Sequence, residues 1–179
     1  HSLIDNKKLF NFLNKNLKKI LNLSSPFIEK AVYESCKIKK KVVEKDEKET
    51  ALRKVLNFGH TFAHAYEAGL GYSHKLNHGE AVILGMRTAL NFSLREDILS
   101  KREYNLIINH IDNSGLPFSI KKYFSIKDSN KILSFMIKDK KNNSEKINLV
   151  LLKKIGNPIF NKQYSKKNLS YFLEKFLTN

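Results

Sequence analysis

Apolar residues recur at helical spacing along most of this chain, with polar residues between them. The pattern predicts an amphipathic helix over residues 3–23, interrupted at one point at most. A second helix is expected to begin with Ser25 as N-cap and Pro26 as its first residue, and to run to about Val43. Thr50 is a candidate N-cap for the next helix. Further helices are predicted over 50–69, 79–98, 100–112, 128–138 and 165–177.

One segment follows a strand pattern instead. Over 146–154, Ile147, Leu149 and Leu151 alternate with more outward positions that include Leu152, and a turn at 156–158 predicts a hairpin with the residues around 159–160. The polar run 44–49 predicts a solvated turn or a helix end. No repeat or linker divides the chain. The predicted fold is therefore mostly α, a single multi-helix domain over 1–179 with a small β-hairpin.

The composition invites one function class, nucleic-acid binding, but its details argue against that class. The 179 residues include 33 basic and 17 acidic side chains, which gives a net charge of +16 and invites a nucleic-acid partner. Only four of the basic residues are arginine, the residue that base and phosphate recognition most often uses. Lysine and asparagine are in excess together, which indicates a compositional habit of the source. We therefore expect no nucleic-acid partner, although a basic binding module stays open as an alternative.

The chain has one cysteine, Cys36, so it cannot form an internal disulfide, and it suits a reducing compartment. We expect Cys36 to be a small buried side chain. No run approaches the roughly 18 apolar residues of a membrane span, and the start lacks a signal-peptide pattern. These features predict a cytoplasmic protein with no membrane partner. The first residue is His1 rather than methionine, which suggests a piece of a longer protein.

The most informative feature is a cluster of histidines and glycines between residues 59 and 85. On the helix predicted over 50–69, Arg53, Asn57, His60 and His64 are spaced by four, three and four residues, which places all four on one face. The flanks of this stripe are apolar, and buried polar groups need partners. The stripe is therefore poorly explained as part of a core and indicates a functional site.

Two histidines one turn apart can bind a divalent metal, and neutral imidazole is a good zinc ligand. His78, after a glycine-bounded loop, is a candidate third ligand. The alternative, a hydrogen-bonded histidine pair without a metal, stays open from spacing alone. We expect Glu67 and Glu80 to hydrogen-bond a ligand or cap a helix rather than bind a metal themselves.

These residues resemble a known family. The run 52–65 (LRKVLNFGHTFAHA), the pair Gly71-Tyr72 and the run 78–82 (HGEAV) closely resemble 3-dehydroquinate synthases of the shikimate pathway, in aromatic amino acid biosynthesis. The lysine-containing helix at 39–43, the acidic turn that follows it and Asp139-Lys140-Lys141 before the strand agree with the same family. The resemblance runs through nearly the whole chain. Ala63 stands where many members carry glycine.

The resemblance implies that an α/β domain that binds NAD⁺ precedes this chain, and that residues 1–179 are only the C-terminal metal- and substrate-binding domain. His60 and His78 would bind the metal, zinc or cobalt, and the third ligand would be a glutamate just before His1. His64 would not be a metal ligand. It would contact the phosphate region of the substrate together with Asn57.

The same resemblance implies that Lys39 and Arg53 bind the carboxylate and hydroxyl groups of an anionic sugar acid phosphate. Lys140 would bind its phosphate, with Lys141 as the alternative. Arg53, Asn57 and His64 would form the catalytic set, in an enzyme that eliminates phosphate and uses NAD⁺ catalytically. The full-length enzyme would be a homodimer, and this chain alone would be inactive. Another sugar phosphate cyclase of the same superfamily is the alternative.

Overall fold

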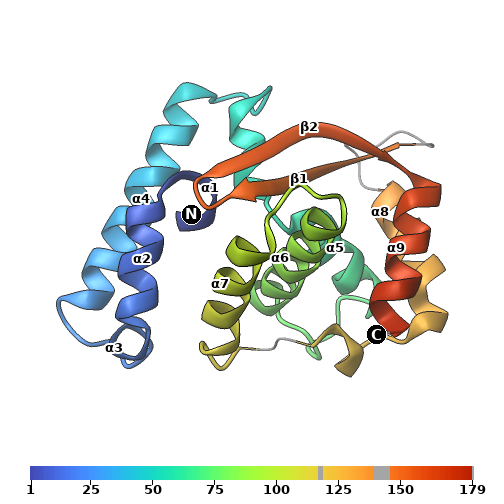
Figure 1. Cartoon of the computed structure of the whole chain (residues 1–179), viewed down its shortest axis with the longest axis horizontal. Coiled ribbons are helices and arrows are strands. Elements are labelled where there is room, and N and C mark those ends of the chain that lie inside the picture. The colour runs from blue at the N-terminus through green and yellow to red at the C-terminus, as the bar shows by residue number, and fades with distance from the viewer. Residues whose placement is uncertain (117–118, 139–145, 179) are drawn as a thin grey trace.

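The computed structural model describes residues 1–116, 119–138 and 146–178 (Figure 1). This part of the chain is mostly helical and contains one two-stranded antiparallel sheet. The hairpin lies across the top of the view in Figure 1, with the N-terminal helices at one end of the molecule and the C-terminal helices at the other. The predicted fold, mostly α with a small β-hairpin, is confirmed. No helix in the described ranges is long and apolar enough to cross a membrane.

The first helical segment is broken twice, where one break at most was predicted. Its three parts are α1 (Ser2–Asp5), α2 (Lys7–Lys15) and α3 (Leu17–Leu21). At the first break the Asn6 side chain accepts a hydrogen bond from the Leu9 N–H at 3.0 Å. At the second, Asn16 Nδ2 donates to the Phe12 carbonyl at 2.9 Å. Asparagine side chains compete with helical hydrogen bonds in this way, so the helix breaks although the apolar spacing continues.

The next helix is α4 (Phe27–Lys45). Pro26 occupies its N-cap position with φ −88° and ψ 15°, and no side chain caps this end, so the predicted Ser25 cap is wrong. The side chains that α4 buries are Ala31, Ile38 and Val42. Cys36 lies two residues from Ile38, on another side of the helix, and is exposed. The prediction that Cys36 is buried is therefore also wrong.

The helix predicted over 50–69 is two helices. A 3₁₀ helix, η1 (Leu52–Asn57), is followed by α5 (His60–Gly69). Gly59 separates them with φ +84°, a conformation that glycine adopts without strain. A Cβ atom on Gly85 of α6 (His78–Arg95) would lie 2.2 Å from the Gly59 carbonyl oxygen. The absence of side chains at Gly59 and Gly85 therefore lets the start of α5 pack directly against α6.

A capping box begins α6, because the Asn77 side chain accepts from the backbone at Glu80 while Glu80 accepts from the Asn77 N–H at 3.0 Å. The predicted capping role is thus confirmed for Glu80. The helix ends at Arg95, three residues before the predicted end, after burying residues on most of its sides. The chain then turns through Asp97, which has φ +54°.

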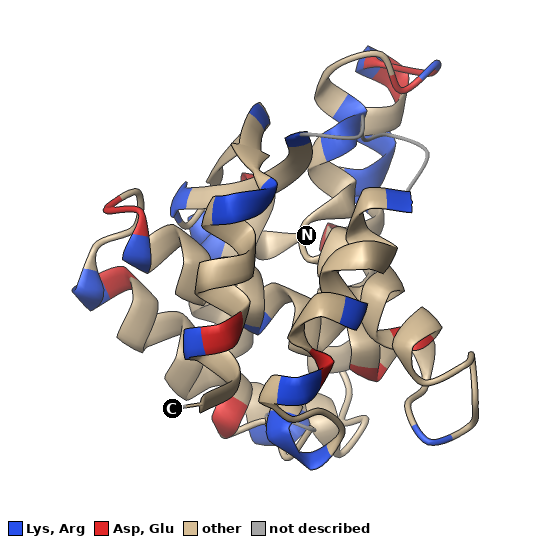
Figure 2. Cartoon of the chain, turned by 90° about the vertical axis from the view of Figure 1, so that its right-hand side faces the viewer, with Lys and Arg blue, Asp and Glu red and all other residues tan. Residues whose placement is uncertain are grey.

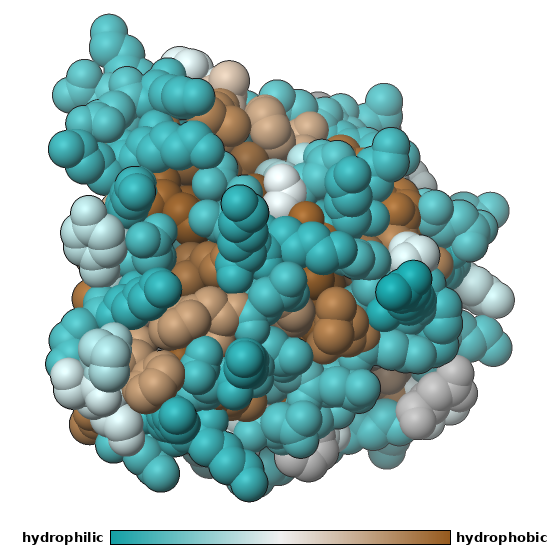
Figure 3. Space-filling model, turned by 60° about the vertical axis from the view of Figure 1, so that its left-hand side comes forward, coloured by the Kyte–Doolittle hydropathy of each residue, from teal (hydrophilic) through white to brown (hydrophobic). Residues whose placement is uncertain are grey.

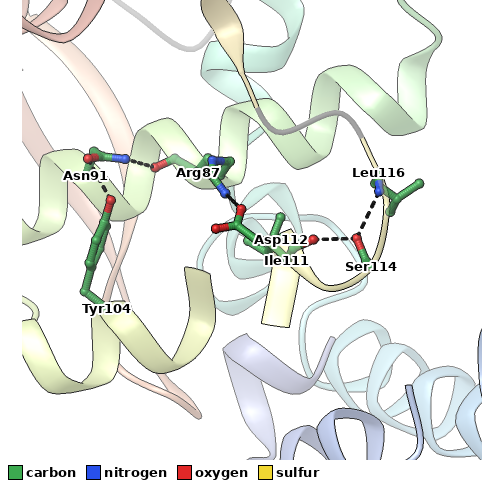
Figure 4. Close-up of polar contacts among 7 residues, drawn as sticks. All are labelled: Arg87, Asn91, Tyr104, Ile111, Asp112, Ser114 and Leu116. Carbon is green, nitrogen blue, oxygen red and sulfur yellow. Dashed lines mark hydrogen bonds and ion pairs between the residues drawn. The ribbon is translucent and has the colours of Figure 1, made fainter. Parts of the chain in front are cut away.

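The following helix, α7 (Lys101–Asp112), begins after Ser100, whose side chain accepts from the Glu103 N–H at 3.3 Å. Polar contacts join α7 to α6 (Figure 4). The Tyr104 hydroxyl donates to Asn91 Oδ1 at 2.9 Å, and Arg87 forms an ion pair with Asp112. These contacts fix the second half of α6 against α7.

The hairpin joins β1 (Lys146–Lys154) and β2 (Asn157–Ser165). Ile147, Leu149 and Leu151 are buried, as their alternation predicted. Leu152, predicted on the outer side, is also fully buried, because the pairing register shifts between Leu149 and Leu151 and the simple alternation ends there. The turn of the hairpin is tied to the N-terminus, since the Gly156 N–H donates to the Leu3 carbonyl at 2.8 Å.

The remaining described elements are η2 (Ile120–Lys122), η3 (Ile126–Asp128), α8 (Ser129–Lys138) and α9 (Lys166–Thr178). Aromatic rings connect α9 to the centre of the molecule. The Phe92 ring of α6 makes edge-to-face contacts with Tyr164 at 4.8 Å and with Phe172 at 4.9 Å between centroids. One core therefore runs from the hairpin through α6 to α9.

Candidate functional site

A buried carboxylate organises the backbone beside the predicted site. Asp46, just after α4, accepts hydrogen bonds from the backbone N–H groups of Thr50, Ala51 and Arg53 at 2.8 to 2.9 Å. These bonds, the one from Arg53 above all, lower the pKa of Asp46 to about 2. Thr50 does not cap the next helix as predicted; its hydroxyl donates to Asp46 at 3.1 Å instead. Asp46 thus holds the start of η1 and with it the backbone of Arg53.

Four of the predicted site residues line one pocket of about 270 Å³. They are Lys39 from α4, Arg53 and Asn57 from η1, and His60 from the first position of α5. The Arg53 guanidinium also donates to the Glu47 carbonyl at 2.7 Å, so its backbone and its side chain are both fixed. The pocket brings a lysine, an arginine, an amide and an imidazole together at one place.

Contrary to the prediction from their spacing, the residues of the predicted stripe do not share one helical face. Arg53 and Asn57 lie on a 3₁₀ helix and His60 on an α-helix, with Gly59 between them, so no continuous helical face carries all four residues of the stripe. The turn that Asp46 holds and the left-handed Gly59 bring Arg53 and His60 to the same pocket. Three members of the predicted stripe therefore do lie together, although for another reason, and the fourth, His64, does not line this pocket.

Glu49 lines the same pocket, and the sequence-based reasoning did not select it. Its carboxylate accepts a hydrogen bond from Asn57 Nδ2 at 2.7 Å, which orients the Asn57 amide. The run 44–49 was predicted to be a solvated turn or a helix end, and α4 does end at Lys45 within it. Asp46 and Glu49, however, are not simply solvated, because both bond to residues of the site region. Their position in the sequence could have indicated this role. An acidic side chain a few residues before Arg53 can accept hydrogen bonds from the N–H groups of the segment that contains Arg53.

Three histidines gather at the junction of α5 and α6. The ring centroids of His60 and His64 are 5.6 Å apart, those of His60 and His78 5.8 Å, and those of His64 and His78 6.3 Å. His64 and His78 are exposed, whereas His60 is half-buried. The structure therefore brings together the two predicted metal ligands, His60 and His78, and the predicted phosphate contact, His64.

The chemistry of His60 suits a metal ligand. Its Nδ1 atom is buried and has no hydrogen-bond partner in the described part of the chain. Burial lowers the pKa of His60 and so favours the neutral imidazole, the form that binds metals. No three His, Cys, Asp or Glu side chains among the described residues are arranged to hold a metal. The donors present fit two ligands of a divalent cation that takes a further ligand from elsewhere.

The remaining predicted phosphate ligand, Lys140, lies outside the described residues, as does its alternative Lys141. A larger pocket, of about 510 Å³, lies between α6, α7, η2 and α9. None of the predicted site residues lines it. The smaller pocket beside the histidines is therefore the candidate site.

An apolar pocket of about 410 Å³ adjoins the candidate site. The two pockets share three lining residues, His1, Leu56 and His60. Side chains of α1, η1, α6 and α7 form most of the rest of its wall. Hydrophobic surface is visible between hydrophilic residues when the α2 and α4 side of the molecule is turned forward (Figure 3). The candidate site thus adjoins an apolar pocket, most of whose apolar lining side chains are buried.

Comparison with known proteins identifies the family of this chain. The family model for the C-terminal part of 3-dehydroquinate synthase matches residues 1–142. The 3-dehydroquinate synthase of Pelagibacter ubique is 62% identical over 178 residues, which are 99% of this chain and 48% of that protein. The enzyme of Desulforamulus reducens is 40% identical over 147 residues, which are 82% of this chain and 40% of that protein. The chain spans about half the length of the curated relatives it matches.

Solved structures show the same fold at lower identity. A 2-epi-5-epi-valiolone synthase from Streptomyces hygroscopicus, solved with NAD⁺ and Zn²⁺ bound, matches 98% of this chain and 48% of its own chain, with a TM-score of 0.82 and 16% identity. A 2-deoxy-scyllo-inosose synthase, solved with carbaglucose-6-phosphate, NAD⁺ and Co²⁺, matches 85% of this chain and 42% of its own chain, with a TM-score of 0.67 and 20% identity. The sequence matches are the more specific finding, and they establish that this chain belongs to the family of 3-dehydroquinate synthase C-terminal domains.

Proposed function

We propose that this chain is the metal- and substrate-binding half of a 3-dehydroquinate synthase. The complete enzyme would convert 3-deoxy-D-arabino-heptulosonate 7-phosphate into 3-dehydroquinate and phosphate. The observation that carries this proposal is the 270 Å³ pocket, where Lys39, Arg53 and Asn57 meet His60. A sugar acid phosphate has a carboxylate, hydroxyl groups and a phosphate, and cations and an amide are the groups that bind them.

Each residue has a role that its chemistry supports. Arg53 would bind the substrate carboxylate, because its planar guanidinium can donate two parallel hydrogen bonds. Lys39 would add a second positive charge. Asn57, oriented by Glu49, and His64 would contact the phosphate region and help to move a proton there. The late phosphate contact, Lys140 or Lys141, is proposed from the family resemblance alone.

His60 and His78 would hold the metal, zinc or cobalt, with a glutamate from the preceding part of the protein as third ligand. When bound, the metal would polarise a substrate hydroxyl and carbonyl, and NAD⁺ would accept and later return a hydride. The buried, unpartnered Nδ1 atom of His60 and the nearby His78 ring support this assignment. NAD⁺ would bind to the other half of the protein.

We also propose that this other half is an N-terminal domain that packs over the apolar 410 Å³ pocket. The relatives are about twice as long as this chain, and the apolar pocket shares His60 with the candidate site. Covering it would bury apolar surface and exclude water from the site at the same time. A homodimer and a cytoplasmic location stay predictions from the sequence.

The substitution Arg53→Gln in the two-domain enzyme tests the substrate assignment. The carboxylate would lose its charged partner, so we expect kcat/KM for the sugar acid phosphate to fall about 100-fold or more. Lys54→Gln is the matched control, because this neighbouring cation bonds Asn161 instead and does not line the pocket. Equal losses in both variants would remove the case for Arg53 as the carboxylate ligand.

The second candidate is another sugar phosphate cyclase, which the shared fold with the valiolone and inosose synthases favours. Arg53 separates the two candidates, since a substrate without a carboxylate offers the guanidinium no negatively charged group to bind. The third candidate is a basic binding module. Figure 2 shows lysine and arginine spread over many helices with acidic residues between them, a distribution that does not favour one nucleic-acid stripe in that view. A gel shift that persists at about 0.2 M salt and survives His60→Ala would favour that module instead.

A further inference from the structure

Glu67 makes a contact whose role the proposed function does not assign. It lies on α5 seven residues after His60 and three after His64, so the helix carries all three toward the start of α6. Its carboxylate Oε1 atom lies 3.0 Å from His78 Nδ1. The Glu67 side chain is only 14% exposed, whereas that of His78 is 60% exposed. A largely buried carboxylate thus holds an imidazole that is otherwise mostly in solvent.

This contact selects one form of the His78 ring. A carboxylate accepts a hydrogen bond, so Nδ1 carries the proton that it donates, and a neutral ring then keeps its free electron pair on Nε2. Histidine in water favours the opposite tautomer, with the proton on Nε2. Without Glu67, the exposed ring would therefore present the wrong nitrogen for much of the time and would also rotate more freely.

The backbone of His78 is fixed independently of Glu67. His78 is the first residue of α6, and the capping box between Asn77 and Glu80 sets the direction in which this helix begins. The capping box does not restrict the rotation of the His78 side chain. The capping box and the Glu67 contact together determine both the position of the ring and the nitrogen that it offers.

We propose that Glu67 is the positioning residue of the metal site: it fixes the His78 tautomer with the proton on Nδ1 and leaves Nε2 for a metal shared with His60. This inference rests on the proposed metal role of His60 and His78. Metal-bound histidines commonly donate their second N–H to a carboxylate, which orients the ring and raises its basicity. Glu67 would position the ligand rather than bind the metal itself, because its carboxylate bonds His78 Nδ1 and leaves Nε2 as the nitrogen with a free electron pair.

The tautomer can be measured without a metal. In the ¹⁵N-labelled chain at about pH 8, long-range proton–nitrogen spectra distinguish a protonated Nδ1 from a protonated Nε2 on each histidine. We expect His78 to carry its proton on Nδ1, and Glu67→Ala to shift it toward Nε2. Glu67→Gln keeps a carbonyl acceptor and should largely restore the wild-type form. Glu29→Ala, which removes an exposed carboxylate of α4, is the control and should change nothing.

A cobalt titration then measures the consequence for binding. We expect the Kd for Co²⁺ to rise about 10- to 100-fold in Glu67→Ala and less in Glu67→Gln. His60→Ala and His78→Ala should each abolish site-specific binding. Circular dichroism of each variant verifies that the helices remain.

The outcomes separate the two proposals. If cobalt binding depends on His60 and His78 but Glu67→Ala changes neither the tautomer nor the Kd, the role of Glu67 is wrong and the metal site stands. If Glu67→Gln abolishes binding as fully as His78→Ala, Glu67 is a ligand and the positioning role is again wrong. If neither histidine affects cobalt binding, the proposed metal site is wrong, and the inference that rests on it is withdrawn.

Discussion

At the scale of single residues, the site depends on side chains that bond to the backbone or to one another rather than to a ligand. Asp46 accepts from three backbone N–H groups, that of Arg53 among them, Glu49 orients Asn57, and Glu67 bonds His78. These contacts fix the directions of the groups that would meet the substrate or the metal. The cations and imidazoles of the site could be predicted from the sequence, because lysine, arginine and histidine are the residue types that bind anions and metals. Of the acidic residues that bond to the site region, only Glu67 was singled out from the sequence, since most carboxylates in a chain are simply solvated.

Asp46 gives the chain a specific dependence on acid. Its pKa is lowered to about 2 in the folded chain, below the ordinary carboxyl value of about 4. The stabilisation it provides is therefore fully present above about pH 4 and is lost as the pH falls through about 2. We expect Asp46→Asn to lower the unfolding temperature at pH 7, and the difference from the wild type to shrink toward pH 2. Glu47→Gln, at an exposed neighbour, is the control. A difference in unfolding temperature that stays constant over this range would contradict the assignment.

Thr88 supports the buried ring of Tyr66. The two hydroxyl oxygens are 2.7 Å apart, both residues are fully buried, and burial raises the pKa of Tyr66. Thr88→Val keeps the shape but removes the partner of a buried hydroxyl, so the free energy of unfolding should fall by about 1–3 kcal/mol. Denaturant titration measures this change. In a Tyr66→Phe background, the same substitution should cost clearly less, and an undiminished cost would show that the hydrogen bond is not its cause.

At the scale of elements, the lengths and types of most helices followed from apolar spacing, because each needs one buried face. The details that spacing missed have local causes. Asn6 and Asn16 break the first helix, a register shift buries Leu152, and Gly59 separates η1 from α5. Each depends on a side chain that competes with the backbone, or on a contact with a distant element. A periodicity of apolar residues contains neither kind of information.

The packing of α5 on α6 can be tested through its glycines. A Cβ on Gly85 would meet the Gly59 carbonyl oxygen at 2.2 Å, so Gly85→Ala must push the helices apart. We expect a loss of about 1–3 kcal/mol or more in the free energy of unfolding, although alanine favours helix by up to about 1 kcal/mol. Gly79 lies in the same helix with open space around it, and Gly79→Ala should leave the metal-free chain as stable or slightly more stable. Equal effects at both positions would contradict the close approach of α5 and α6.

At the scale of the whole molecule, the candidate site lies beside an apolar pocket that shares His60 with it. Its matches are to the C-terminal part of proteins about twice its length. We expect the isolated chain to release no phosphate from the sugar acid phosphate. Addition of the separately produced N-terminal half with NAD⁺ and Zn²⁺ should restore activity if the two halves associate. Ile83→Asp, which places a charge in the apolar pocket but outside the 270 Å³ pocket, should weaken that association at least tenfold.

Most of the net charge of +16 lies outside the candidate site. The basic residues assigned to the substrate in the described chain are Lys39 and Arg53, and the other cations do not line their pocket. The remaining positive charge would attract an anionic substrate to the surface in a way that salt screens. A stronger salt dependence of KM than of kcat is therefore expected.

Phosphate release by the two-domain enzyme is the most direct measurement. With NAD⁺ and Zn²⁺ present, 3-deoxy-D-arabino-heptulosonate 7-phosphate should release one phosphate per molecule and yield 3-dehydroquinate, and His60→Ala and Arg53→Gln should each nearly abolish the release. A sugar phosphate without a carboxylate should release little. Turnover of the uncarboxylated sugar phosphate with none of the sugar acid phosphate would contradict the assignment and place this chain in another sugar phosphate cyclase.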